Sequence, residues 1–261
     1  MVAAPPHGYL AEYSVTGGDA GDDERVQVSL KPAAPQPASL ERLRARRTTR
    51  SGQQPRPLSS ADAKSLVDHF DHRAHFFSPT SREGRYLAKG TIEANRAQAF
   101  RDDAQEELAA WIRLPNSQAR AHRDGLTQES MEIAGFAGWY VRHFMSRAAV
   151  LSQGFGEQGL DRIKQQMAAC GGWIVVTSPD GSLPALIEAG RRTERMWLAV
   201  RDRSIAVHPM TQMLEESPFR ERLAQDLGIT GSIQFLLQVG YVYQYPEAVS
   251  LRRPVSAILK A

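Results

Sequence analysis

The clearest pattern of apolar and polar positions lies between residues 173 and 213. Residues 173–177 form an apolar run between a glycine pair and a Ser-Pro-Asp-Gly turn, which is typical of a buried strand. Residues 183–201 then place apolar side chains at helical spacing with charged side chains between them. A short apolar run at 205–207 predicts a second strand. This strand–helix–strand unit is the skeleton of an α/β layer, and we expect the loop that starts at His208 to be free to hold a ligand.

The other elements are predicted from capping residues and helix breakers. Ser39 is the predicted cap of a short basic helix, and residues 59–62 are the predicted cap of the next helix. The further elements predicted are a long polar helical stretch at 85–111 ended by Leu114-Pro115, a turn at Asp124-Gly125, a more apolar helix at 132–151, a loop at 154–159, a helix at 219–227 and a strand at 235–243 interrupted by Gly240.

The first part of the chain differs in composition from the rest. Residues 1–38 contain Pro-rich and Gly/Asp-rich pieces that are typical of linkers. Two short alternating pieces between them, 9–15 and 26–30, are candidate edge strands that do not make a domain alone. We therefore expect a linker-like segment at 1–38, followed by one domain at 39–261.

Composition narrows the function classes. The single cysteine, Cys170, excludes a disulfide framework and a cysteine-based metal site, and its apolar neighbours predict a buried side chain. No apolar run approaches the roughly 20 residues of a membrane span. No signal-peptide pattern is visible, so the default expectation is a cytoplasmic protein. The formal net charge of +3 suits a phosphorylated small molecule better than a long polyanion.

Two arginine clusters are the first candidates for chemistry. Arg44, Arg46, Arg47 and Arg50 enclose Thr48 and Thr49, and Arg252-Arg253 stand near the end of the chain. Guanidinium groups are fork-shaped donors for phosphate, and threonine hydroxyls add short donors beside them. The alternative interpretation is a pair of solvated, solubilising faces.

The histidines give weaker signals. His69, His72 and His75 have a spacing that drifts around a helix, so we interpret them as surface or packing residues and predict no metal site. His208 follows a predicted strand, yet no Ser or Cys nucleophile elbow and no Gly-rich phosphate loop accompanies it. No catalytic residue is assigned. A nucleotide site would depend on side chains and isolated backbone amides.

Several motifs together resemble a known family. Residues 46–50 (Arg-Arg-Thr-Thr-Arg) are similar to the opening Arg-x-Ser/Thr-x-Arg/Lys signature of FMN-dependent nitroreductases, and 208–212 are similar to that family's Pro-containing loop. Residues 236–243 followed by Arg252-Arg253-Pro254 resemble its final strand and terminal segment. Residues 107–113, 123–126 and 208–215 resemble the Acg-type subfamily more narrowly.

The resemblance implies an α+β fold, with a nitroreductase-like central mixed β-sheet flanked by helices and a long central helix. It implies FMN at an interface between two such units. Arg46, Thr48 and Arg50 would bind the phosphate, the ribityl chain or the ring edge, and Arg252 would close on the same phosphate. The loop from Pro209 would lie beside the ring, with a backbone N–H directed at it. The full set of implied cofactor residues is Arg46, Arg47, Thr48, Arg50, Pro209, Met210, Thr211, Gln212, Arg252 and Arg253.

The departures from the family pattern bear on assembly. The chain is similar to the second half of a fused pair, its N-terminal segment resembles the end of a missing first half, and the Asn/Gln-Pro-Trp signature of a first half is absent. Ser250 stands where the resemblance implies a lysine. Hence a homodimer or a separate nitroreductase-like half completes the site, or the flavin site is degenerate.

Three functions follow as expectations. The first is NAD(P)H-dependent reduction of nitro or quinone acceptors by an FMN oxidoreductase. The second is a non-catalytic Acg-type protein that sequesters FMN. The third is nucleic-acid binding by the basic helix at 42–50, which predicts a steep salt dependence but lacks interleaved aromatic and amide side chains for base contact.

Overall fold

The computed structural model describes residues 2–16, 25–37, 40–113, 116–133, 135–144 and 146–259. The predicted cap Ser39 and the predicted helix end at Leu114-Pro115 lie outside the described residues. Among the helices that are described, none is both long enough and apolar enough to cross a membrane.

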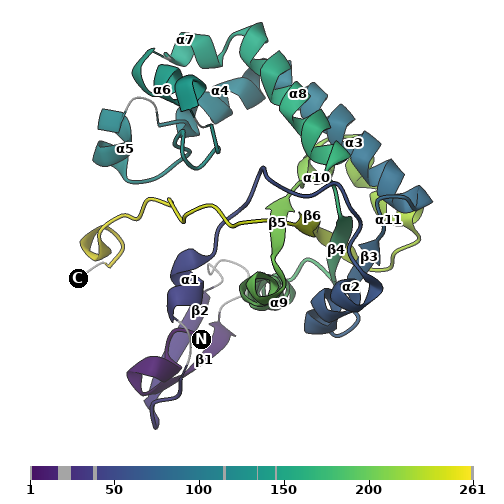
Figure 1. Cartoon of the computed structure of the whole chain (residues 1–261). Coiled ribbons are helices and arrows are strands. Elements are labelled where there is room, and N and C mark those ends of the chain that lie inside the picture. The colour runs from purple at the N-terminus through teal and green to yellow at the C-terminus, as the bar shows by residue number, and fades with distance from the viewer. Residues whose placement is uncertain are drawn as a thin grey trace.

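A four-stranded sheet with strand order β3-β4-β6-β5 forms the centre of the molecule (Figure 1). The strands are β3 (Ala74–Phe77), β4 (Gly172–Ser178), β5 (Ile205–Pro209) and β6 (Ser232–Tyr241). Helices flank this sheet, so the α+β class is confirmed.

The pairing within the sheet differs from the mixed sheet that the resemblance implied. Each neighbouring pair of the described strands is antiparallel. The predicted strand–helix–strand unit is present as β4, α9 (Leu183–Ala199) and β5, and β4 and β5 do run in the same direction. They are not neighbours, because β6 lies between them and is antiparallel to both. The central sheet is therefore antiparallel between all its described neighbours.

Both faces of β4 are buried, which explains why its sequence is continuously apolar rather than alternating. Ile174 and Val176 pack in a core with Met196 of α9, together with Leu66 of α2 (Ser60–Val67). Trp173 and Val175 face the opposite core, built from α3 (Arg82–Ala99), α10 (Gln212–Glu215) and α11 (Phe219–Leu227). Ser59 caps α2 as predicted, its side chain accepting the backbone N–H of Asp62.

Cys170 belongs to the second of these cores and is buried, as the sequence predicted. Burial raises the pKa of its thiol to about 12. It therefore stays protonated at neutral pH and behaves as a small apolar residue.

The predicted loop at 154–159 is wrong. Residues Gln153–Ala168 form α8, with Ser152 as the N-cap. One of the glycines that suggested a loop serves packing, because a Cβ on Gly156 would lie 2.9 Å from the backbone oxygen of Ala99 on α3. Glycine therefore permits α8 and α3 to approach closely.

The predicted interruption of the last strand is also wrong. β6 runs unbroken from Ser232 through Gly240, which pairs with Ala206 of β5. A Cβ on Gly171 would lie 2.8 Å from the Cα of Gly240, so the two glycines allow two backbones to meet. A glycine inside a strand marks close approach here, not an end.

The long stretches predicted as single helices are divided. Residues 85–111 form α3 and α4 (Asp102–Trp111), which separate at Phe100-Arg101. Residues 132–151 form α6 (Gly135–Phe144) and the short α7 (Arg147–Val150). Helices α4, α5 (Asn116–His122), α6 and α7 lie together beyond the ends of α3 and α8 (Figure 1).

The N-terminal pieces pair with each other instead of with the central sheet. β1 (Tyr9–Thr16) and β2 (Arg25–Pro32) form a separate antiparallel pair. It follows η1 (Pro5–His7) and precedes α1 (Leu40–Ala45). The Arg191 guanidinium lies 4.8 Å from the centre of the Tyr13 ring, which connects this pair to α9. The remaining single-turn helices are η2 (Asp68–Phe70), η3 (Val200–Arg203) and η4 (Val255–Ala257).

Candidate functional site

The arginine segment at 46–50 is held against the sheet by its backbone. Thr49 donates its backbone N–H to the Val207 carbonyl of β5 at 3.2 Å, and the Trp197 indole N–H of α9 donates to the Arg47 carbonyl at 3.2 Å. Thr49 is fully buried. The chain therefore reaches the sheet edge in a fixed register, and the arginine side chains on either side of Thr49 are placed by that contact.

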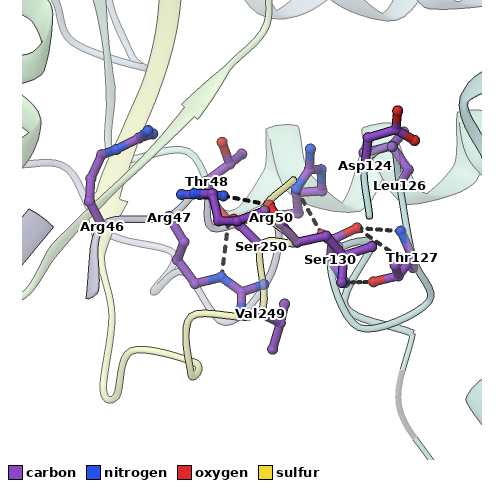
Figure 2. Close-up of a pocket in the computed structure, with 13 residues that line it drawn as sticks. Arg46, Arg47, Thr48, Arg50, Asp124, Leu126, Thr127, Ser130, Val249 and Ser250 are labelled. Atoms are coloured by element: carbon purple, nitrogen blue, oxygen red, sulfur yellow. Dashed lines mark hydrogen bonds between the residues drawn. The ribbon is translucent and has the colours of Figure 1, made fainter. Parts of the chain in front are cut away.

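A polar cavity of about 230 Å³ lies beside this segment (Figure 2). Its walls come from the arginine segment, the loop after α5 and the C-terminal tail. The lining residues are Arg46, Arg47, Thr48, Arg50, Asp124, Gly125, Leu126, Thr127, Ser130, Val249, Ser250, Leu251 and Arg252. We call it the smaller cavity. The structure thus brings Arg46 and Arg252 to one cavity from opposite ends of the chain.

The cavity arginines differ in their protein partners. Arg46 makes an ion pair of 3.1 Å with Glu194 and stacks over Trp197 at 5.0 Å from the ring centre. Arg252 donates to the Leu251 carbonyl at 2.8 Å, and within the described residues it has no acidic partner. A cation without an acidic partner, at the wall of a polar cavity, is suited to an anionic ligand.

Arg47 is engaged by the protein itself. Its guanidinium donates to the Thr48 carbonyl at 3.2 Å, to the Glu247 carbonyl and to the Glu132 carboxylate at 2.9 Å. The side chains of Arg47 and Glu132 are only 6% and 8% exposed. In this arrangement Arg47 supports the cavity wall, and its role in binding a cofactor stays a prediction.

Glu132 is the polar residue that sequence reasoning missed. Besides Arg47, its carboxylate accepts the Arg50 backbone N–H at 3.1 Å and the Ser51 hydroxyl at 2.6 Å. Its φ of 58° lies in the left-handed region, which non-glycine residues rarely adopt. The sequence offered no signal for it, because Glu132 is distant from the arginine motif and was placed at the start of a helix.

The C-terminal tail is attached to the loop after α5 by Asp124. This carboxylate pairs with Arg253 and accepts from Arg113 Nε at 2.8 Å. The hydrogen bond from Arg253, with further help from Arg113, lowers the pKa of Asp124. Arg253 is therefore an anchor of the tail in this structure, and the neighbouring Arg252 is the one that lines the smaller cavity.

A second cavity of about 440 Å³, the larger cavity, lies between α3, α4, α8 and the end of β5. Arg50 lines both cavities. Much of the lining is apolar: Leu108, Leu126, Met131, Ile133, Phe155, Leu160, Ile163 and Met210. Volume and composition are typical of a site for a small organic ligand.

The predicted segment 209–212, which runs from the last residue of β5 to the first residue of α10, contributes only part of its residues to the larger cavity. Pro209, Met210 and Gln212 line it, whereas Thr211 is not among its lining residues. The backbone N–H of Met210 donates to the Leu236 carbonyl at 2.7 Å, and proline has none. The ring-directed N–H that the resemblance implied is therefore not supplied by Pro209 or Met210.

His208 is buried next to Arg50 at the floor of the larger cavity. Burial, followed by the positive charge of Arg50, lowers the pKa of His208 to about 3. The imidazole is therefore neutral at physiological pH. Three buried polar atoms of cavity-lining residues have no hydrogen-bond partner: His208 Nδ1, Gln166 Oε1 and Gln212 Oε1.

The remaining histidines considered in the sequence are His69, His72 and His75. No group of His, Cys, Asp and Glu side chains in the described part of the chain is arranged to hold a metal ion. Burial lowers the pKa of both His69 and His75, which is typical of packing residues.

Fold and site together define a class: an α+β protein with an arginine-lined cavity that shares Arg50 and Leu126 with a larger, mostly apolar one. No protein-family model matches the chain, and no curated protein matches it. The solved structures found to be similar include FMN-dependent and FMN-bound nitroreductases.

One of these structures is the FMN-dependent nitroreductase NfnB from Mycobacterium smegmatis in complex with NADPH, with 13% identity over 85% of this chain and 96% of that chain, at a TM-score of 0.48. Another is a nitroreductase with bound FMN from Bacteroides fragilis, with 14% identity over 85% and 97% of the two chains and a TM-score of 0.46. A third is oxidised iodotyrosine deiodinase bound to FMN and 3-iodo-L-tyrosine, with 11% identity over 82% and 95% and a TM-score of 0.46.

Proposed function

We propose that this protein is an FMN-binding oxidoreductase that takes electrons from NAD(P)H and passes them to nitro or quinone acceptors. The observation that carries the proposal is the meeting of Arg46 and Arg252 at one polar cavity that shares Arg50 with a larger apolar cavity. Such a pair of cavities fits a ligand with an anionic end and a flat apolar end.

The residues present fit FMN at both ends. Arg46, Thr48 and Arg252 supply donors for a phosphate, while the helix faces around the larger cavity supply apolar surface for a ring. When bound, FMN would supply the hydride chemistry. The chain itself binds the phosphate, orients the ring and keeps water from it, and no residue of the chain is assigned a proton-transfer step.

Flavin retention tests the assignment. The purified protein should show a flavin absorption spectrum, and Arg46→Ala and Arg252→Ala should each weaken FMN binding by roughly 10- to 150-fold, because a charge-assisted hydrogen bond contributes about 1.5–3 kcal/mol. Arg220→Ala is the matched control, since Arg220 is exposed on α11 outside both cavities. Unchanged FMN affinity in both cavity variants would refute the proposal.

A second candidate is a protein that sequesters FMN without catalysis. The buried Glu132–Arg47 ion pair favours it, because it fixes the segment around Glu132 over the arginine motif. The two candidates differ in one measurement. Rapid bleaching of the flavin by NADPH supports the oxidoreductase, and a bound flavin that NADPH does not bleach supports sequestration.

We also propose that a second copy of the chain, or a separate nitroreductase-like half, completes the site. Large apolar side chains stand exposed on α6 and on the C-terminal tail, including Phe136, Val255, Ile258 and Leu259. Exposed apolar groups of this kind favour an interface. Light scattering should give a dimer mass, and a strictly monomeric protein that binds no FMN would contradict both proposals.

Nucleic-acid binding has less support. Two of the basic residues that suggested it pair with acidic side chains: Arg42 with Asp202 and Arg47 with Glu132. The charges of these two residues are therefore largely compensated by the protein itself. DNA affinity with a steep salt dependence would revive this alternative.

A further inference from the structure

Gln166 occupies a junction between the sheet, α8 and the arginine segment. It lies in the last turn of α8 and is only 9% exposed. Its side-chain N–H donates to the Arg50 carbonyl at 2.6 Å, and its own backbone carbonyl accepts from the Gln238 side chain at 2.7 Å. The first of these bonds fixes which way the amide points, because a carbonyl accepts only from the nitrogen end.

This orientation turns the other end of the amide into a free acceptor. Gln166 Oε1 is buried and has no hydrogen-bond partner, although Gln166 lines the larger cavity. Buried polar atoms are normally satisfied, so an unpaired one at a cavity wall indicates a group that a ligand is expected to bond.

The surroundings restrict what that ligand presents. Gln212 lines the same cavity and its Oε1 is also buried without a partner, while most of the remaining wall is apolar. Oxygen acceptors in an apolar wall select a flat ring that carries an N–H donor. A ring with only carbonyl groups at that edge would leave Gln166 unsatisfied.

We propose that Gln166 is a specificity-determining residue of the larger cavity, whose Oε1 accepts a hydrogen bond from a ring N–H of a heteroaromatic ligand. The assignment rests on the proposed function, under which the donor is the imide N–H between the two carbonyls of the flavin ring. Gln166 belongs to none of the motifs that resemble the nitroreductase family. Its role follows from the unpaired acceptor and from the bond that orients it.

The experiment compares two ligands and three proteins. FMN and N3-methyl-FMN, in which the imide proton is replaced by a methyl group, are titrated into wild type, Gln166→Met and Gln165→Met, with flavin fluorescence as the readout. Gln165 is the control, because it is the adjacent residue on α8, is exposed and does not line the larger cavity. Wild type and Gln165→Met should bind FMN at least tenfold more tightly than N3-methyl-FMN. In Gln166→Met this ratio should fall to about one or below.

The outcomes separate this proposal from the function on which it rests. If wild type binds both flavins equally well, Gln166 does not accept the imide N–H, while FMN binding itself stands. If wild type binds neither flavin, the proposed function fails and this assignment fails with it. Should Gln166→Met not fold, Gln166→Asn replaces it. Equal affinity of wild type for the two flavins overturns the assignment even without a folded variant of Gln166.

Discussion

The two cavities share Arg50 but are built in different ways. The smaller cavity is walled by the arginine segment, a loop and the tail, and its important groups are charged. The larger cavity is walled mainly by helix faces and the end of β5, and apart from Arg50 and Arg162 its polar groups are side-chain amides and the neutral imidazole of His208. The smaller cavity is suited to an anion, and the larger cavity is suited to a flat, uncharged ring.

Arg50, which lines both cavities, has a pKa that neighbouring groups shift in opposite directions. Burial lowers the pKa of its guanidinium, the Glu132 carboxylate acts in the opposite direction, and Arg47 lowers it further. Its side chain donates to the Ser130 carbonyl at 2.8 Å, which is part of the smaller cavity. A cation held at this boundary can stabilise negative charge at either end of a ligand that spans both cavities.

The largest effect is expected at Glu132, which holds the arginine segment at the boundary between the two cavities. Glu132→Ala should lower the free energy of unfolding by about 3–5 kcal/mol, because it leaves Arg47 as an uncompensated buried charge. Urea denaturation measures this change. The control Glu107→Ala, at an exposed position of α4, should stay within about 0.5 kcal/mol of wild type. A loss below about 1 kcal/mol for Glu132→Ala would show that the pair does not hold the boundary.

The next prediction separates the cavities by ligand. Arg252→Ala should weaken FMN binding by roughly 10- to 150-fold and leave riboflavin, which has the same ring but no phosphate, unchanged. Gln166→Met should weaken both ligands, since its target is the ring. Parallel titrations of FMN and riboflavin measure this. Equal losses for both ligands in Arg252→Ala would contradict the division of roles between the cavities.

The third prediction concerns the floor of the larger cavity. Because the pKa of His208 is about 3 in the folded protein, the unfolded chain takes up a proton at this residue between pH 6.5 and about 3 that the folded chain does not. The contribution of His208 to the free energy of unfolding is fully present above pH 6.5. Below that pH it falls by at most about 1.4 kcal/mol per pH unit.

His208→Gln should remove that part of the slope when unfolding free energies are measured from pH 7 to pH 4. His122→Gln, at an exposed position, should keep the wild-type slope. If His208→Gln retains the wild-type slope, the imidazole is not held neutral at the cavity floor.

The smallest effect is expected at the anchor of the tail. Asp124→Asn removes the carboxylate that pairs with Arg253 and Arg113. Hydrogen exchange of the backbone amides at 249–253 should therefore become faster. The FMN affinity of this variant should fall less than that of Arg252→Ala. The lowered pKa of Asp124 means that its contribution is present above its unfolded pKa and is lost as the pH falls through the folded value. Wild-type exchange rates in Asp124→Asn would show that the backbone alone holds the tail.

Part of this architecture follows from local sequence patterns. The apolar run at 173–177, the helix at 183–201 and the cap at Ser59 are each predicted by features within a few residues of one another, and each is present. The loop predicted at 154–159 and the strand break predicted at Gly240 are both wrong, because Gly156 and Gly240 each lie where another backbone approaches closely. A glycine that permits close packing and a glycine that ends an element look the same in the sequence.

The sequence by itself determined the apolar centre of the fold and the two arginine clusters, because hydrophobic periodicity and guanidinium chemistry are readable over short distances along a chain. Only the tertiary structure decided that β6 separates β4 from β5, that Glu132 joins the arginine segment, and that Gln166, whose side-chain oxygen is unpaired, lines the larger cavity. Each of these depends on residues that are far apart in sequence. Their contacts arise when the packing of the cores fixes how the elements meet.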